Sequence, residues 1–225
     1  MVIEHSSTTP NSDIEFPKIF KFPAHIISVV FHPLFIPIYA TWYIAFVHPL
    51  FFTGMNDSVR YWILIRVFIN MVFFQGVSVL LLKGVGFIDS IFLRSQRDRI
   101  IPYITAGIFY FWMYLVFHNQ LYVPLILPAF VFGAFLATSA ALIANIYFKV
   151  SMHAIGMGGL LGLLLVILSY THSAIGIPAP LMITLFFTGL VCTSRLLVSD
   201  HKQGDIYMGL FIGIICQFIG AMWVL

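Results

Sequence analysis

Long hydrophobic runs alternate with short polar breaks along the chain. Apolar segments of helix length lie near residues 23–47, 61–82, 101–117, 121–145, 154–171, 178–195 and 205–225. A helix needs about 20 apolar residues to cross a bilayer, and its backbone groups must pair within the segment because lipid offers them no partners. The pattern therefore predicts an all-α, polytopic membrane helix bundle with about six or seven transmembrane helices.

The first apolar segment is expected to be a broken helix. Pro33 and Pro37 fall inside it, and proline removes backbone hydrogen bonds from a helix interior. His32 precedes the first of these prolines and is a candidate cap for the break. The four residues 32–35, His-Pro-Leu-Phe, occur again at 48–51, but the similarity extends no further and is not interpreted as a repeat.

Composition favours a membrane protein over a soluble one. Of the 225 residues, 61% are hydrophobic and 8% are charged, with a mean hydropathy of +1.02, whereas soluble domains carry about 25% charged residues. A net charge of +3 is too small to indicate a nucleic-acid partner, and the two cysteines fit no disulfide or zinc pattern. We expect a polar tail over residues 1–20 and one domain over 21–225. That domain is expected to be multi-pass in the cell (inner) membrane, with the lipid bilayer as its partner and no oligomeric state specified.

Counting crossings divides the polar breaks between two sides of the membrane. If the N-terminus lies on side A, the breaks at 83–100, 146–153 and 196–204 lie there too. Side B then holds the C-terminus and the breaks at 48–60, 118–120 and 172–177. Glycine pairs at 158/162 and 209/213 predict close packing of the fifth and seventh segments, because small residues let helix backbones approach each other.

Side A gathers the residues that carry chemistry. Its clusters are 94–102, 149–153 and 194–205, which contain several cations and two histidines. Arginine binds phosphate oxygens with paired N–H groups, and a neutral imidazole can attack phosphorus or transfer a proton. His201 and Asp205 are four residues apart, so on one helix they would share a face and the carboxylate would orient the ring. This pattern favours phosphoryl transfer, although a basic loop beside a membrane is also typical of a topology signal or a lipid headgroup contact.

The third cluster resembles a known family signature. Ser194-Arg195, five residues, His201, three residues and Asp205 match the third motif of the type 2 phosphatidic acid phosphatase superfamily at all four positions and both spacings. Residues 206–213 are also similar to the last helix of that family. This is the most specific functional signal in the chain.

The other two motifs of that family are matched in part. Ser151 and His153 resemble the second motif, Pro-Ser-Gly-His, with valine in place of its proline and methionine in place of its glycine. Arg99 and Pro102 resemble the end of the first motif, with two residues inserted between them. The position of that motif's lysine holds phenylalanine here, and Arg94 or Arg97 is a candidate substitute. The resemblance covers about residues 94–213.

The resemblance implies a mechanism without a metal or cofactor. His201 would be the nucleophile, Asp205 its orienting partner, and His153 the general acid that later activates water. The implied substrate is a membrane lipid phosphate or diphosphate. The residues expected to bind its phosphate are Arg99, Ser151 and Arg195, with Lys149, Arg94 and Ser194 as further candidates.

Two questions stay open at this level. The same site would also suit a phosphotransferase with an acceptor other than water, or a non-catalytic protein that binds anionic lipid or a partner. Two arguments also disagree about whether the site on side A faces the cytoplasm or the opposite side of the membrane. Of 11 Lys and Arg residues, only Arg60 and Arg66 fall on side B, which predicts a cytoplasmic side A. The family resemblance implies an outward-facing or lumenal site instead.

Overall fold

The structure is a computed structural model, and it describes residues 18–91, 93, 95–171, 175–198 and 201–225. Within these ranges the chain is helical and contains no β-strand. Six helices are long and apolar enough to cross a membrane, which confirms the predicted all-α, polytopic bundle. Of the predicted tail over residues 1–20, residues 1–17 lie outside the described residues, and the last three form the start of α1.

The six long spans follow the predicted segments, with shifted ends. The first span runs through α3 (Asp57–Val67), the π-helical turn η2 (Phe68–Phe73) and α4 (Phe74–Gly84) without interruption. The others are α5 (Gln96–His118), α6 (Ile126–Ala144), α7 (Met152–Thr171), α8 (Pro178–Val198) and α9 (Gln203–Val224).

Among the six long spans, the starts of α5 and α6 differ most from the predicted boundaries, by five residues each. Helix α5 begins at Gln96, whereas the polar residues 96–99 were predicted to lie outside the membrane span. The Ser95 hydroxyl accepts a hydrogen bond from the backbone N–H of Asp98 at 3.0 Å and so caps the helix. The cap places Arg99 in the first turn, where it is buried.

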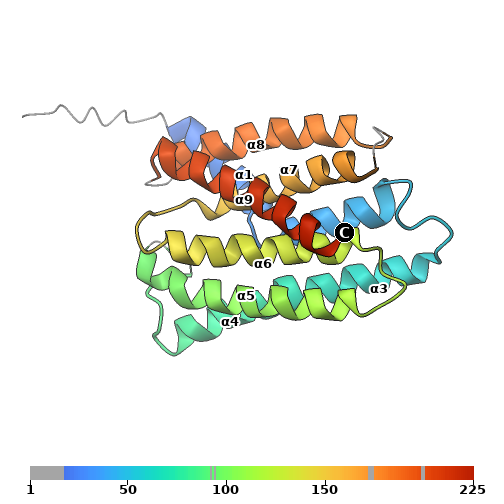
Figure 1. Ribbon diagram of the computed structural model, residues 1–225. Coiled ribbons are helices and arrows are strands. Elements are labelled where there is room, and N and C mark those ends of the chain that lie inside the picture. Colours follow the sequence, from blue (N-terminus) through green and yellow to red (C-terminus); the bar gives the residue numbers. More distant parts are fainter. Residues whose placement is uncertain (1–17, 92, 94, 172–174, 199–200) are drawn as a thin grey trace, which may run out of the picture.

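The first apolar segment is broken, as predicted. It forms α1 (Lys18–Val30), then an irregular stretch at 31–35, then α2 (Ile36–Trp42) with the π-helical turn η1 (Tyr43–Val47). Neither half is long enough to cross a membrane alone. In Figure 1, α1 lies at one end of the bundle beside α8, and the chain continues through the interior into α2. Residues 31 and 33–35 of this break are half-buried, whereas His32 is exposed.

The helix ends divide between two ends of the molecule as the crossing count predicted. The connections from α4 to α5 and from α6 to α7 lie at the left of Figure 1, as do the C-terminal end of α8 and the N-terminal end of α9. The connections from η1 to α3 and from α5 to α6 lie at the right, with Leu225. The left end is side A, and it carries all three predicted clusters.

Glycines bring α7 and α9 into direct backbone contact. A Cβ atom added to Gly209 would lie 2.8 Å from the Ser151 carbonyl oxygen, and one added to Gly162 would lie 3.0 Å from Ile214 Cα. A Cβ at Gly213 would meet the carbonyl oxygen of Ile155. The predicted pairing of these helices is confirmed, and it fixes the start of α7 beside the start of α9.

Candidate functional site

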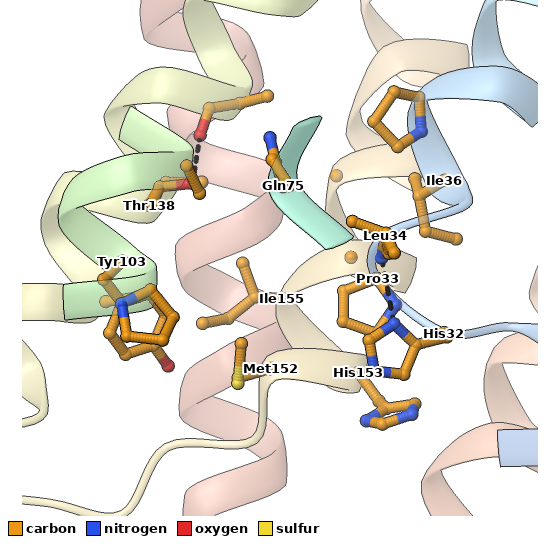
Figure 2. A pocket seen from close by; sticks show the side chains of 18 of the residues that line it. His32, Pro33, Leu34, Ile36, Gln75, Tyr103, Thr138, Met152, His153 and Ile155 are labelled. Atoms are coloured by element: carbon orange, nitrogen blue, oxygen red, sulfur yellow. Dashed lines mark hydrogen bonds between the residues drawn. The ribbon is translucent and has the colours of Figure 1, made fainter. Parts of the chain in front are cut away.

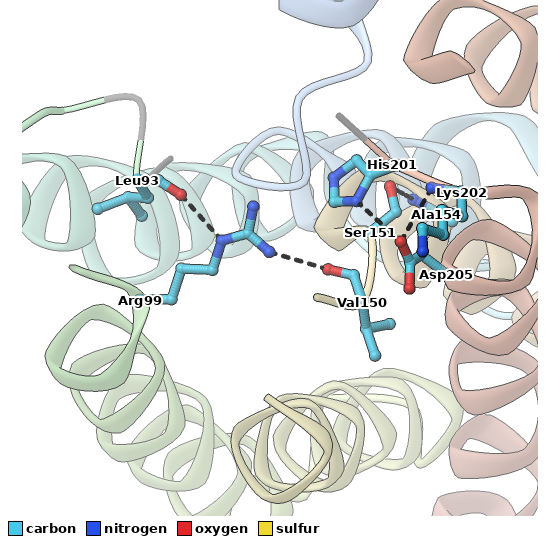
Figure 3. Close-up of polar contacts among 8 residues, drawn as sticks. All are labelled: Leu93, Arg99, Val150, Ser151, Ala154, His201, Lys202 and Asp205. Carbon is cyan, nitrogen blue, oxygen red and sulfur yellow. Dashed lines mark hydrogen bonds and ion pairs between the residues drawn. The ribbon is translucent and has the colours of Figure 1, made fainter. Parts of the chain in front are cut away.

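Arg99 connects two loops at side A. Its Nε donates a hydrogen bond to the Leu93 carbonyl at 2.9 Å, and one terminal nitrogen donates to the Val150 carbonyl at 3.1 Å. Figure 3 shows the guanidinium extending from α5 across the bundle towards His201. An arginine has five N–H donors, so two backbone acceptors leave donors for a further acceptor. Arg99 thus holds the loops before α5 and α7 together and still presents positive charge.

The start of α7 is attached to the start of α9 through Ser151. Its backbone N–H donates to the Asp205 carbonyl at 3.2 Å, and its hydroxyl accepts from the N–H of Ala154 at 3.4 Å. Ser151 is completely buried, and the hydroxyl serves as a helix cap. Lys149, two residues earlier, is half-buried, and its backbone hydrogen-bonds the ring of His201.

His201 and Asp205 lie close together, but not on one helix face. The structure places His201 in the loop before α9, so the predicted helical geometry is wrong. The two are brought together by a turn instead, in which Asp205 Oδ2 accepts from the backbone N–H of Lys202 at 2.9 Å. His201 Nδ1 then lies 3.9 Å from the same oxygen, within ion-pair range but longer than a hydrogen bond. The His201 side chain is only 3% exposed (Figure 3).

His153, in the first turn of α7, is held by the broken segment. Its Nε2 lies 2.9 Å from the Ser28 carbonyl oxygen in α1. A carbonyl can only accept, so Nε2 carries the proton. Ser28 lies in the last turn of α1, where carbonyl groups lack partners within the helix. The end of the half-helix therefore orients the ring and leaves Nδ1 for other contacts.

Arg195 and Ser194 occupy the last turn of α8 but point to different surroundings. Arg195 is half-buried and lines the cavity described next. Ser194 is 3% exposed, and its hydroxyl donates to the Leu190 carbonyl of its own helix at 2.7 Å. Only the arginine of this pair faces the site.

A cavity of about 390 Å³ begins at these residues and extends into the bundle. Its polar end is formed by Arg99, His153, Arg195 and His201. Figure 2 shows Met152, Ile155 and residues 32–34 of the break around the cavity. Its interior end includes Gln217 of α9, which is 14 residues beyond Gln203 and therefore roughly 20 Å from the start of that helix. Most of the wall in between is apolar, with Phe130, Ala134 and Ala137 of α6 among its residues.

The polar end of the cavity is electrostatically positive. Arg99 and Arg195 are close enough to influence each other and His201. The N-termini of α5, α7 and α9 also lie at side A, and helix N-termini carry partial positive charge. Burial, together with these two arginines, lowers the pKa of His201 to about 4, while Asp205 and the backbone of Lys149 act in the opposite direction. His201 is therefore neutral near pH 7, with an unprotonated ring nitrogen, and the site attracts anions.

The structure brings together five of the nine predicted site residues. Arg99, His153, Arg195 and His201 line the cavity from four different parts of the chain, and Asp205 lies directly behind His201. Ser151, Ser194 and Lys149 do not contribute to the lining; the Ser151 hydroxyl caps the start of α7, and the Ser194 hydroxyl bonds the backbone of α8. Arg94 lies outside the described residues. In the part of the chain that the structure describes, no three His, Cys, Asp or Glu side chains are grouped as metal ligands.

Several lining residues were not predicted as site residues. His32 lies at the polar end, and Gln75 and Gln217 lie deeper in the cavity. Gln75 is 7% exposed, and its amide nitrogen has no hydrogen-bond partner among the described residues. A polar residue inside an apolar segment marks a functional position by default, so the two glutamines carried a usable signal. For His32, the one such signal in the sequence was its place at the predicted helix break.

No protein-family model matches the chain, and no curated protein or solved structure matches it. What the site does must therefore be argued from its residues and their geometry.

Proposed function

We propose that the protein is an integral membrane phosphatase that hydrolyses a lipid-linked phosphate or diphosphate. The observation that carries the proposal is the meeting of two arginines and two histidines at one end of a cavity inside a membrane bundle. These residues come from α5, α7, α8 and the α8–α9 loop. Arginines stabilise the charge of a transferring phosphoryl group, and the histidines supply the nucleophile and the proton carrier.

The shape of the cavity supports a lipid-linked substrate. Its cationic end lies at side A, and its largely apolar wall extends to Gln217, which is roughly 20 Å from the start of α9. A ligand that fills both parts has an anionic group joined to a hydrocarbon chain. A water-soluble phosphate would leave the apolar part without a partner.

The proposed reaction has two steps. Neutral His201 attacks phosphorus, the bond to the lipid oxygen breaks, and that oxygen takes a proton from His153. A water molecule, deprotonated by His153, then attacks the phosphohistidine, which releases inorganic phosphate and restores His201. Asp205 stabilises the positive charge that develops on the His201 ring, and Arg99 and Arg195 hold the phosphate oxygens. Because Nε2 of His153 keeps its proton on the Ser28 carbonyl, Nδ1 is the atom that exchanges these protons. The ring is therefore cationic when it gives the Nδ1 proton to the lipid oxygen, neutral afterwards, and cationic again once Nδ1 has taken a proton from water.

A second candidate is an anionic-lipid-binding protein without turnover. The observation in its favour is that the Ser151 hydroxyl caps α7 and the Ser194 hydroxyl bonds the backbone of α8, while Arg99 hydrogen-bonds two backbone carbonyls. Fewer groups are then available to a transition state than the sequence motifs imply.

Turnover of lipid phosphates by the purified full-length chain tests these candidates. Phosphate release from a panel of single-chain and two-chain lipid phosphates and diphosphates should proceed in excess chelator. His201→Ala should lower it by at least about 1000-fold, because loss of a nucleophile removes the whole reaction path. The matched control is His118→Ala at side B, which should retain the wild-type rate.

The alternative outcomes are distinct. Strict dependence on added magnesium, or more than a tenth of the wild-type activity in His201→Ala, would show that the proposed mechanism is wrong. Transfer of phosphate to an added alcohol in preference to water would identify a phosphotransferase. Binding of the lipids without any turnover would favour the second candidate.

A further inference from the structure

His32 lies at the polar end of the cavity, outside all three sequence clusters. It belongs to the irregular stretch between α1 and α2, and its side chain lines the cavity together with His153, Arg195 and His201 (Figure 2). The ring centroids of His32 and His153 are 5.2 Å apart, with the rings nearly perpendicular. The positive charge of Arg195 acts on both rings. A third histidine therefore shares the surroundings of the proposed phosphate site.

The hydrogen bonding of His32 fixes its tautomer. Its Nδ1 accepts a hydrogen bond from the backbone N–H of Leu34 at 3.2 Å. An accepting nitrogen carries no proton, so the neutral ring bears its proton on Nε2. Nε2–H is then a donor that the turn does not use. This geometry provides a hydrogen bond for an anion without adding positive charge to the ring.

The chain contains a natural comparison for this turn. His48 begins the second His-Pro-Leu-Phe stretch, and its Nδ1 accepts from the backbone N–H of Leu50 at 3.4 Å. That turn lies at side B, where His48 is 4% exposed and packs against Phe51 instead of lining the cavity. The same local structure thus forms at both places. The turn alone does not require His32 to line a site with two arginines.

We propose that His32 binds the substrate's phosphate group by donating its Nε2–H to a phosphate oxygen. The ligand class is a phosphate or phosphonate carried by a hydrocarbon chain. The inference rests on the proposed function only in that the polar end of the cavity binds this anion. The Nε2–H of His32, from the break between α1 and α2, would then bind the anion together with the N–H groups of Arg99 and Arg195.

Binding of decylphosphonate to the full-length chain in detergent tests this role without turnover, because its phosphorus–carbon bond is not hydrolysed. Isothermal titration should compare the wild type with His32→Asn and His48→Asn. Asparagine accepts a hydrogen bond from the N–H two residues later, so it keeps either turn while removing the ring. His32→Asn should weaken binding about 10- to 100-fold, as expected for loss of a hydrogen bond to a charged group. His48→Asn should bind like the wild type.

Two further measurements identify the contact. Inorganic phosphate should compete with decylphosphonate, and His32→Asn should weaken both ligands by a similar factor, since the lost contact is to the anion. His32→Gln should restore most of the affinity, because its amide N–H occupies the place of Nε2–H. Thermal unfolding of each variant separates loss of binding from loss of folding.

Each contrary result overturns the inference. The inference is wrong if His32→Asn binds with unchanged affinity, or if both asparagine variants lose the same amount of affinity. It is also wrong if His32→Asn loses affinity for decylphosphonate but not for phosphate, or if the wild type does not bind decylphosphonate. Failure of the proposed function looks different. A wild type that binds decylphosphonate through His32 yet releases no phosphate from any lipid would leave the binding role intact and remove the catalytic one.

Discussion

At the residue scale, Asp205 has two tasks that the sequence motif did not separate. Its carboxylate caps the start of α9 through the N–H of Lys202, and the same oxygen lies 3.9 Å from His201 Nδ1. The first task fixes the loop that carries His201. The second places negative charge beside a ring that burial and two arginines keep neutral.

The change Asp205→Asn should separate the two tasks. Asparagine still accepts the hydrogen bond from Lys202, so folding should be retained, but the charge that stabilises a cationic ring is lost. We expect kcat to fall about 10- to 100-fold. The carboxylate raises the pKa of His201, so its removal lowers that pKa below about 4 and moves the acid limb of the rate profile to lower pH.

A matched control exists at the start of α5. Asp98 is the acidic residue of that helix's first turn and accepts a hydrogen bond from the N–H of Asp89 at 3.3 Å, but it does not line the cavity. Asp98→Asn should leave both kcat and the acid limb unchanged. If Asp205→Asn also leaves kcat and the acid limb unchanged, the charge of the Asp205 carboxylate does not contribute to the reaction.

At the element scale, the contact between α7 and α9 positions the site. His153 lies in the first turn of α7 and His201 lies just before α9, so their separation depends on how closely these helices pack. The glycines of both helices allow backbone to contact backbone. A wider spacing would separate the proton carrier from the nucleophile.

Gly213→Ala should therefore destabilise the fold and reduce activity together. The added methyl group would collide with the carbonyl of Ile155, and such overpacking costs about 1–3 kcal/mol. Thermal unfolding in detergent measures the effect. Gly189→Ala in α8 is the control, because a Cβ there has no neighbouring atom within 4 Å and alanine favours helix. Equal stability of the two variants would show that the close contact is not required.

At the scale of the whole molecule, charge is distributed very unevenly between the two ends. Side B carries Arg60 and Arg66, and Arg66 donates to Gln120 Oε1 at 2.9 Å and to the Tyr122 hydroxyl at 2.8 Å in the α5–α6 loop. It therefore reaches the surface at side B, as its sequence position predicted. The other nine Lys and Arg residues fall on side A by the crossing count, and they include Lys18 and Lys21 of α1.

We expect side A, with the site, to face the cytoplasm, because an excess of Lys and Arg marks the cytoplasmic side. Leu225 at side B should then lie outside it. An alkaline phosphatase fused after Leu225 should be active in cells, and a fluorescent protein fused there should be dark. The reverse pattern would contradict either the orientation or the crossing count. Labelling of Asn119→Cys by an impermeant reagent shows which of the two is wrong. Labelling in intact cells means that side B is outside and the crossing count is wrong. Labelling only after permeabilisation means that the orientation is the opposite of the expected one.

The sequence by itself determined the membrane bundle, the break at Pro33 and the gathering of three polar clusters at side A. These features follow from local physics: apolar length sets the spans, proline ends a helix, and an alternating count of crossings assigns the ends. The spacing of Arg195, His201 and Asp205 likewise lies within one short stretch of chain. Such short-range patterns can be identified without knowing which helices are neighbours.

Only the tertiary structure decided which of the polar side chains meet. Ser151 and Ser194 match sequence motifs, but the Ser151 hydroxyl caps the start of α7 and the Ser194 hydroxyl bonds the backbone of α8. His32 matches no motif, yet helix packing places it 5.2 Å from His153, which is 121 residues later. The depth of the cavity and the lowered pKa of His201 arise in the same way. Burial and charge depend on atoms supplied by distant segments, and one-dimensional spacing contains no information about those contacts.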